Sequence, residues 1–236
     1  MKNVLEIKNL NKKYFNSIVL NNLNLTLKEN TIVGILGPNG SGKTTLLKII
    51  AGLAKESSGE VLINGLKPST KTKSMVSYLS DKNFIDNSLK VYQALNLYND
   101  FFDFDMNKAV KLLDEMKINI KSEIASLSKG MKEKVFLILT LSRNAKIFIL
   151  DEPIAGVDVI TRDQILNIII ENVLENSTML ITTHLIKDIE RIFDEVAFLK
   201  DGKIDEVYKV DELRENSGLT IEELYKEIFK EGDNNA

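Results

Sequence analysis

Short apolar runs alternate with stretches of helical periodicity along most of the chain. Apolar residues fall at every second position in Leu5–Leu10 and Leu23–Leu27, which is the spacing of half-buried strands. Thr31–Leu36 is a continuous apolar run that ends at Gly37, as expected for a strand covered on both faces. Because such strands continue to alternate with helices, the pattern predicts an α/β fold with a largely parallel sheet.

The remaining elements follow from the same two periodicities. Further strands are expected at Glu60–Ile63, Val76–Leu79, Ile147–Leu150 and Met179–Thr182, with a hairpin of Val196–Leu199 and Lys203–Val207. Helices are expected at Thr44–Ala54, from Ser128 to about Ser142, at Thr161–Leu174, and from Thr220, which has capping-box spacing to Glu223. The tail Gly232–Ala236 is expected to be frayed.

The middle of the chain has a different texture, because strand-like runs stop there and helical periods dominate. Val91, Leu95 and Tyr98, for example, recur at helical spacing and would share one face. We interpret this stretch as a helical insertion into a single domain. The expected organisation is a core of residues 1–85 and 144–210, an inserted helical lobe of residues 86–143, and a C-terminal helical extension of residues 211–236.

The composition removes several classes of site. The chain has no Cys and one His, which excludes a disulfide scaffold, a thiolate zinc site, a cysteine nucleophile and any site that needs two imidazoles. With 31 Lys and Arg against 34 Asp and Glu, its net charge of −3 argues against a nucleic-acid partner. The apolar runs are far shorter than the roughly 18–20 residues of a membrane span, so we expect a soluble cytoplasmic chain.

The segment Gly37–Thr44 fits the phosphate-loop pattern G-x-x-x-x-G-K-[ST] and lies between a predicted strand and a predicted helix. Its glycines allow backbone N–H groups to turn inward toward phosphate oxygens, and the following helix adds its positive end. Lys43 suits the β- and γ-phosphates of a nucleotide, and the Thr44 hydroxyl suits Mg²⁺. We expect ATP contacts from Gly37, Asn39, Gly40, Ser41, Gly42, Lys43, Thr44 and Thr45.

Two acids follow the predicted strand Ile147–Leu150. The carboxyl ends of parallel strands face the ligand crevice, so Asp151 is expected near Mg²⁺, which it would hold through water. Glu152 lies one residue further out, where it can accept a proton from an attacking water or orient it. Two solvated acids at a strand end are the alternative, which the complete phosphate loop disfavours.

A second anion-binding pattern begins the helix expected from Ser128. A Ser hydroxyl at the N-cap, the exposed N–H of Gly130 and the helix N-terminus together can bind an anion. In isolation the same residues describe an ordinary capped helix. Their position shortly before Asp151 favours the functional interpretation.

Together these features resemble the ATP-binding subunit of ABC transporters over about residues 4–210. The phosphate loop, the Leu127–Met131 signature, the Asp151-Glu152 pair and Thr183-His184 occur in that family's order. The resemblance implies a P-loop NTPase core, an N-terminal antiparallel β region and an inserted helical subdomain. It also implies two subunits arranged head to tail around ATP and Mg²⁺.

The resemblance assigns further residues to that dimeric site. Ser128, Gly130 and Asp158 would act in trans on the nucleotide held by the partner subunit. His184 would be the catalytic switch residue that hydrogen-bonds the γ-phosphate, beside the base Glu152. Tyr14 would stack on adenine, with Phe15 as the alternative.

Three positions depart from the family pattern. Lys129 replaces a usual Gly, and it either adds a cation near the trans phosphate or points to solvent. Met131 replaces a usual Gln. Asp81 takes the place of the usual Gln ligand of Mg²⁺; it is either a metal ligand or a surface turn residue. These departures resemble exporter-type systems with separately encoded membrane subunits.

The expected function is therefore an ATPase subunit that moves a substrate, by export, through a separate multi-span membrane subunit. That partner would dock near Asp81 and the Asp86–Asn99 segment, which would make the chain peripheral on the inner face of the membrane. The alternative is a soluble ABC-type ATPase in the assembly of a cofactor or macromolecular complex. A GTPase is disfavoured because the chain has no Asn-Lys-x-Asp motif.

Overall fold

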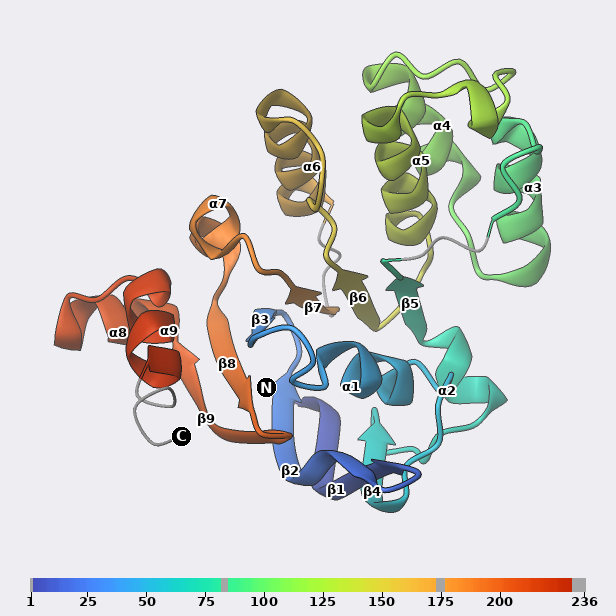
Figure 1. Cartoon of the computed structure of the whole chain (residues 1–236). Helices are drawn as coiled ribbons and strands as arrows, with labels where there is room; N and C mark the ends of the chain where they lie inside the picture. Colours follow the sequence, from blue (N-terminus) through green and yellow to red (C-terminus); the bar gives the residue numbers. More distant parts are fainter. Residues whose placement is uncertain (1, 82–84, 173–176, 231–236) are drawn as a thin grey trace.

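Two β-sheets, with helices on both sides of the larger one, make up the chain (Figure 1). The computed structural model describes residues 2–81, 85–172 and 177–230. Within these ranges, no helix combines the length and the hydropathy that crossing a bilayer requires.

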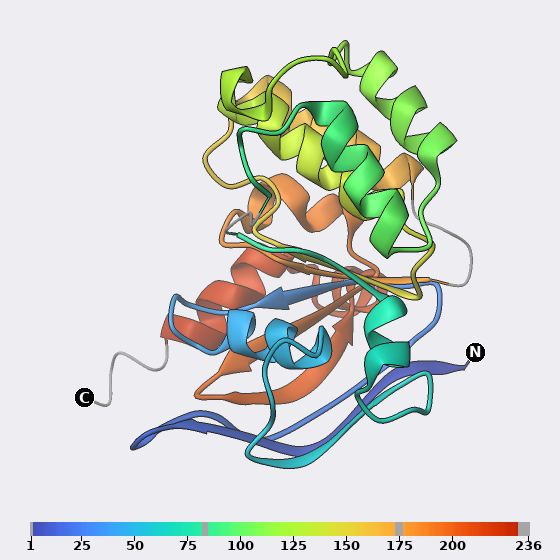
Figure 2. The ribbon, with the colours of Figure 1, turned by 90° about the vertical axis from the view of Figure 1, so that its right-hand side faces the viewer.

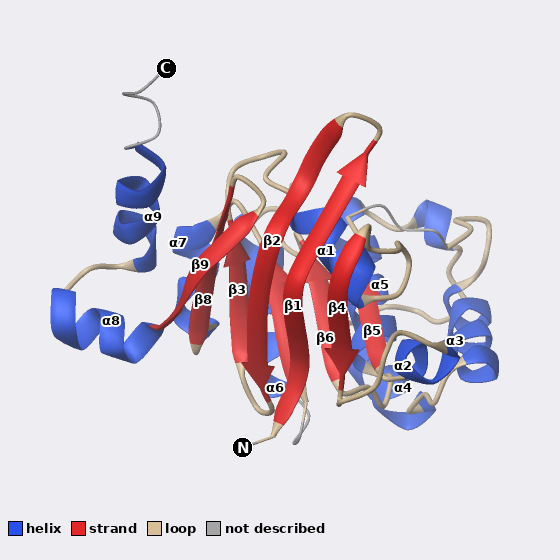
Figure 3. Cartoon of the chain, turned by 90° about the horizontal axis from the view of Figure 1, so that it is seen from below, coloured by secondary structure: helices blue, strands red, loops and turns tan. Residues whose placement is uncertain are grey.

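The smaller sheet is antiparallel and is formed by the N-terminal part of the chain. Its strands are β1 (Asn3–Tyr14), β2 (Ser17–Lys28) and β4 (Ser58–Ile63), in the order β2-β1-β4 (Figure 3). The N-terminal antiparallel region implied by the family resemblance is thus confirmed.

The larger sheet has the order β5-β6-β7-β3-β8-β9. Its strands are β3 (Ile32–Leu36), β5 (Val76–Leu79), β6 (Ile147–Asp151), β7 (Thr178–Thr182), β8 (Glu195–Lys200) and β9 (Lys203–Lys209). All neighbouring pairs are parallel except β8 and β9, which form the expected hairpin. The predicted α/β fold with a mainly parallel sheet is confirmed, and the carboxyl ends of β3, β6 and β7 share one edge.

Nine α-helices lie in the described residues. They are α1 (Lys43–Ile50), α2 (Thr70–Ser74), α3 (Val91–Phe101), α4 (Met106–Glu115), α5 (Lys129–Leu141), α6 (Val159–Glu171), α7 (Ile186–Ile189), α8 (Val210–Ser217) and α9 (Ile221–Lys230). Short 3₁₀ turns lie at Ile124–Ser126 and Glu190–Ile192. Figures 1 and 2 show α3, α4 and α5 grouped as a lobe on the side of the sheet away from β1 and β2.

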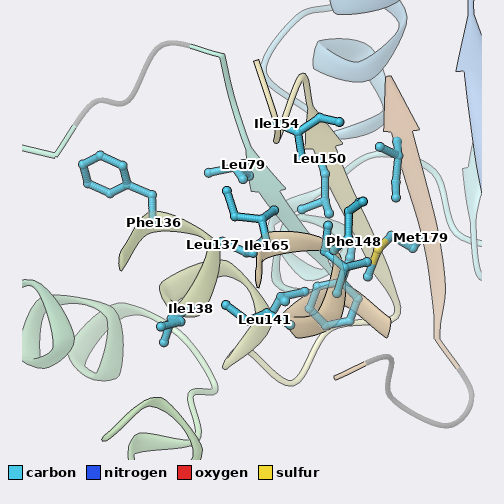
Figure 4. Close-up of a cluster of buried hydrophobic side chains, with 14 of the residues drawn as sticks. Leu79, Phe136, Leu137, Ile138, Leu141, Phe148, Leu150, Ile154, Ile165 and Met179 are labelled. Carbon is cyan, nitrogen blue, oxygen red and sulfur yellow. The ribbon is translucent and has the colours of Figure 1, made fainter. Parts of the chain in front are cut away.

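Alternate residues of the central strands enter two different cores. In β6, Ile147 and Ile149 pack with α1 and the antiparallel sheet, whereas Phe148 and Leu150 pack toward α5 and α6. Figure 4 shows Phe148 and Leu150 among side chains from α5, α6 and β7. A strand buried on both faces explains why this segment is continuously apolar in sequence.

Arg143 joins the helical lobe to the sheet. Its Nη1 donates to the backbone oxygen of Val76 in β5 at 2.8 Å, and its guanidinium carbon lies 3.9 Å from the centre of the Phe102 ring. The residue is buried, so this stacked and hydrogen-bonded cation fixes the end of α3 against the edge of the sheet.

Element ends differ from the expected ones in ways that local geometry explains. The helix expected to reach Ala54 ends at Ile50, since Gly52 adopts a left-handed φ of 68°. Helix α6 begins at Val159 rather than Thr161, because the Asp158 carboxylate caps it. Its expected end at Leu174 and the tail Gly232–Ala236 lie outside the described residues. The Thr220–Glu223 capping box is confirmed by reciprocal hydrogen bonds of 2.8 and 3.2 Å.

Phe148 provides a test of the two-core arrangement. Replacing this buried ring by alanine in Phe148→Ala should lower the free energy of unfolding by about 3–5 kcal/mol, because it removes apolar contacts and leaves a cavity. Urea unfolding followed by circular dichroism measures the change. The matched control Phe101→Ala, at a side chain that is 73% exposed, should change stability by less than about 1 kcal/mol.

Candidate functional site

A cavity of about 470 Å³ opens at the carboxyl-end edge of the large sheet. Its lining comes from segments far apart in sequence: Val19, Asn39, Gly40, Gly42, Lys43, Thr44, Thr45, Asp81, Asp151, Glu152, Ala155 and His184. Most of the residues expected to contact ATP or Mg²⁺ in the same chain are therefore brought together. Gly37 and Ser41 belong to the loop but do not line the cavity.

The phosphate loop depends on glycine at two positions. Gly40 and Gly42 have φ values of 83° and 107°, which L side chains rarely adopt. A Cβ on Gly42 would also lie 3.0 Å from the carbonyl oxygen of Val19 in β2. The loop therefore closes against the antiparallel sheet, and α1 begins within it at Lys43, directly after Gly42.

Lys43 is held by the loop that precedes it. Its buried ammonium donates to the carbonyl oxygens of Gly37 at 2.7 Å and Pro38 at 3.0 Å. Burial lowers the pKa of Lys43, while the nearby charges of Glu152 and Asp151 act in the opposite direction. The result is a preoriented cation that faces two carboxylates across the cavity.

Asp151, at the end of β6, is fixed by neighbours on both sides. The Thr182 hydroxyl donates to its Oδ1 at 2.6 Å, and the Tyr78 hydroxyl donates to its Oδ2 at 3.2 Å. Burial, followed by the charge of Asp151, raises the pKa of Tyr78 well above its ordinary range, which keeps its hydroxyl a donor. These two bonds set the orientation of a carboxylate that is only 3% exposed.

Glu152 and His184 form a pair at the mouth of the cavity. Glu152 Oε2 lies 2.9 Å from His184 Nδ1 and also accepts the His184 backbone N–H at 3.3 Å. Glu152 has a left-handed φ of 57°, and its N–H donates to the Thr182 carbonyl at 3.0 Å. The turn thus directs the carboxylate sideways to the segment after β7, where it can accept a proton from water.

The lining also has oxygen donors that suit Mg²⁺. The exposed Thr44 hydroxyl and the Asp81 and Asp151 carboxylates border the same cavity. Within the described part of the chain, no cluster of three or more metal-binding side chains forms a cage. This set fits Mg²⁺, because that ion is usually held by one or two carboxylates together with substrate phosphates and water.

Ser128, Gly130 and Asp158 lie together, but they do not line this cavity. Ser128 caps α5 through a 3.3 Å bond from the Met131 N–H, which confirms the expected N-cap. A Cβ on Gly130 would lie 2.9 Å from the Thr161 side chain, and the Thr161 hydroxyl donates to Asp158 at 2.7 Å. Hydrogen bonds from the Thr161 backbone and hydroxyl lower the pKa of Asp158.

Tyr14 and Phe15 lie at the β1–β2 turn and do not line the cavity. The Tyr14 ring is 44% exposed, and the Lys12 ammonium lies 4.5 Å from its centre. Phe15 is fully exposed and has a left-handed φ of 50°. The structure therefore provides two exposed rings at the β1–β2 turn and selects neither as the adenine contact.

Several residues that shape the site were missed in the sequence. Thr182 and Tyr78 hold Asp151, and Val19 supports the phosphate loop. Thr182 could have been found, because Asp151 and Thr182 end neighbouring parallel strands and are paired in the β6–β7 register. Val19 carried no comparable signal, since its contact depends on how the two sheets are placed.

Comparison with protein families identifies the chain. A family model described as ABC transporter matches residues 20–155, which include the phosphate loop, the signature and the Asp151-Glu152 pair. The chain belongs to the ABC transporter family. It is thus an ATP-binding ATPase of that family, with the α/β architecture described above.

Individual ABC relatives agree with this assignment. The ABC transporter ATP-binding protein YtrB of Bacillus subtilis is 32% identical over 90% of this chain and 74% of its own length. The lantibiotic transport ATP-binding protein SrtF of Streptococcus pyogenes is 29% identical, covering 85% and 89%. A solved ATP-binding subunit of an ABC transporter superposes with a TM-score of 0.85 at 26% identity, covering 95% of this chain and 99% of that one.

Thr182→Val tests the support of Asp151. The change keeps the side-chain shape but removes a donor to a buried carboxylate, so the free energy of unfolding should fall by about 1.5–3 kcal/mol. Urea unfolding of the nucleotide-free protein gives the value. The control Thr178→Val, on the same strand, removes a hydroxyl that donates to a neutral carbonyl, so it should lower the free energy of unfolding by less. Equal losses in the two variants would contradict a special role for the Asp151 bond.

Proposed function

We propose that the chain binds ATP and Mg²⁺ in the 470 Å³ cavity and hydrolyses ATP as one of two head-to-tail subunits. The cycle drives a substrate, in the direction of export, through a separate multi-span membrane subunit. The observation that carries the proposal is the convergence of Lys43, Asp151, Glu152 and His184 on one cavity at the sheet edge.

Phosphate binding is assigned to the loop Gly37–Thr44 and to Thr45. Asn39, Gly40, Ser41 and Gly42 form the turn whose N–H groups suit phosphate oxygens, and α1 follows with its positive end. Lys43 exchanges its two carbonyl contacts for the β- and γ-phosphates. Tyr14 is assigned to adenine, because aromatic stacking is a common mode of base binding.

Mg²⁺ would be held by Thr44, Asp151 and Asp81, and it supplies charge neutralisation for the phosphates when it is bound. Asp151 contributes a carboxylate whose direction is set by Thr182 and Tyr78. Asp81 differs from an amide because it adds negative charge and cannot donate a hydrogen bond.

Glu152 is assigned as the general base, which takes a proton from the water that attacks the γ-phosphorus. Its 2.9 Å contact with His184 holds the carboxylate at the mouth of the cavity and supports a joint role. His184, half-exposed beside that carboxylate, is assigned to the γ-phosphate. Because the transferred phosphoryl group reacts in line, this positioning is the main contribution of these side chains.

The assignment of a dimer rests on the predicted ATP-binding residues that do not line the cavity of their own chain. Ser128 and Gly130 lie with Asp158 on a separate patch, where they are available to a nucleotide bound by a second subunit. The first turn of α5 adds the positive end of a helix to that patch. ATP held between two such surfaces favours the closed dimer, and hydrolysis removes that preference.

The membrane subunit is placed on the helical lobe near Asp81 and the Asp86–Asn99 segment. Tyr92 and Leu97 of α3 are 39% and 40% exposed there, and they are the side chains assigned to this contact. Residues 86–143 would move as one lobe against the core of residues 1–85 and 144–210, and the expected C-terminal extension of residues 211–236 is described only as far as Lys230. The lantibiotic transport relative favours export, and docking would place the chain at the inner membrane face.

Lys43→Ala and Glu152→Gln separate binding from chemistry. Lys43→Ala should weaken ATP binding, because it removes the buried cation that faces the phosphates. Glu152→Gln should keep ATP binding and lower turnover by about 10²–10⁴-fold, since the amide cannot accept the proton. Fluorescent-nucleotide titration and phosphate release measure the two effects. Unchanged turnover in the Glu152→Gln variant would contradict the assignment of the base.

Tyr92→Ser combined with Leu97→Ser tests the membrane contact. The wild-type chain should recover a multi-span protein from detergent extracts of its source membranes, and the double variant should lose that protein while binding ATP normally. Val110→Ser is the matched control, because Val110 is 41% exposed on α4 of the same lobe but outside the docking segment. Recovery of soluble partners alone would favour an assembly ATPase instead.

A further inference from the structure

A second cavity, of about 300 Å³, adjoins the nucleotide cavity on the side of the helical lobe. It is lined by Leu79, Ser80, Asp81, Lys129, Glu133, Asp151, Glu152, Pro153, Ala155 and Gly156. The two cavities share the lining residues Asp81, Asp151, Glu152 and Ala155, so they adjoin each other. Four of the residues lining the second cavity carry carboxylates, and Lys129 is the cation among them.

Lys129 is the first residue of α5; the residue is exposed, and the end of its side chain lies beside Gly156 of its own chain. The Nζ atom occupies the space that a side chain on Gly156 would fill. Gly156 belongs to the loop between Glu152 and Asp158, where it has a left-handed φ of 68°. The absence of a Cβ at Gly156 thus gives the ammonium access to the backbone of that loop.

The charges of this cavity act on one another. Burial raises the pKa of Glu133, one helical turn after Lys129; the Lys129 charge acts in the opposite direction and the Asp81 charge in the same direction. Glu133 is thus close enough to Lys129 and Asp81 for both charges to act on it. Carboxylates that line the same small cavity repel one another unless a cation lies among them.

Two further residues of α5, Gly130 and Lys134, make contacts with α6. Gly130 packs against Thr161 near the start of α6, and Lys134 donates to Gln164 on the next turn. The first two turns of α5 therefore lie along the Gly156 loop and α6. Of Lys129, Gly130 and Lys134, only Lys129 lines the second cavity.

We propose that Lys129 is a positioning residue that fixes the start of α5 on the Gly156 loop of its own chain. Its ammonium fixes the positions of Ser128 and Gly130 relative to Asp158, so that the three residues form one surface. The consequence for a partner subunit rests on the function proposed above. The attachment within the chain does not, because every contact involved belongs to a single subunit.

The test compares Lys129→Met with Lys129→Arg and with Lys132→Met. Arginine keeps the charge, and Lys132→Met removes one charge from the same helix at a residue that lines neither cavity. In the nucleotide-free chain, hydrogen exchange of the amides of residues 130–131 and 155–158 should be faster in Lys129→Met. It should stay near the wild-type rate in the other two variants.

The second readout uses ATP-dependent dimer formation in a Glu152→Gln background, followed by sedimentation. Lys129→Met should raise the dimer dissociation constant about tenfold while leaving nucleotide affinity of the single chain unchanged. Gly156→Ala should act through the same contact, because its Cβ displaces the ammonium. Its effect on the dissociation constant should therefore be less than additive with that of Lys129→Met.

Unchanged exchange in Lys129→Met, or equal acceleration in Lys132→Met, would overturn the attachment. An unchanged dimer dissociation constant in a background that dimerises with ATP would overturn its role in presenting the surface. If the Glu152→Gln chain itself does not dimerise with ATP, the dimeric function proposed above fails. The exchange comparison then decides alone whether Lys129 fixes α5.

Discussion

The parallel pairing of β7 with both β3 and β6 is the constraint on which the site depends. It aligns three strand ends at one edge, so the phosphate loop after β3, the acids Asp151 and Glu152 at the end of β6, and His184 after β7 line the same cavity. The continuously apolar strands keep this alignment, because alternate side chains are buried in two separate cores. Side chains separated by more than a hundred residues in sequence thereby line one cavity.

Lysine and carboxylate side chains face one another in the two cavities at this edge of the sheet. A buried ammonium at Lys43 faces Asp151 and Glu152, while a second ammonium at Lys129 faces the same carboxylates from the helical lobe. Lys43 begins α1 and Lys129 begins α5, so the two cations come from helices on opposite sides of the large sheet (Figure 1). A ligand that carries phosphates and a metal ion would change this balance. In the proposed cycle, that change makes the position of the lobe depend on the nucleotide.

Much of the fold and of the site could be predicted from the sequence, because the main sequence signals depend on residues that are close together in the chain. Periodicity identified the strands, and the Gly37–Thr44 pattern, the acids after β6 and the Ser128 cap each depend on a few adjacent residues. What it lacked were contacts set by packing between elements. The Tyr78 and Thr182 bonds to Asp151, the stacking of Arg143 on Phe102 and the turn of Lys129 toward Gly156 all require the folded chain. The early end of α1 reflects Gly52, whose left-handed conformation outweighed the helical pattern beyond it.

In the proposed dimer, each ATP site is completed by residues of two subunits, and a mixing experiment tests this sharing most directly. Lys43→Ala disables the phosphate loop of a chain, and Ser128→Arg disables the surface offered to its partner. In a mixed dimer one site joins the two damaged surfaces, whereas the other joins an intact loop to an intact signature. Mixing the two inactive proteins should restore ATP turnover that neither has alone. A mixture that stays as inactive as its components, although mixed dimers form, would contradict an ATP site shared by two subunits.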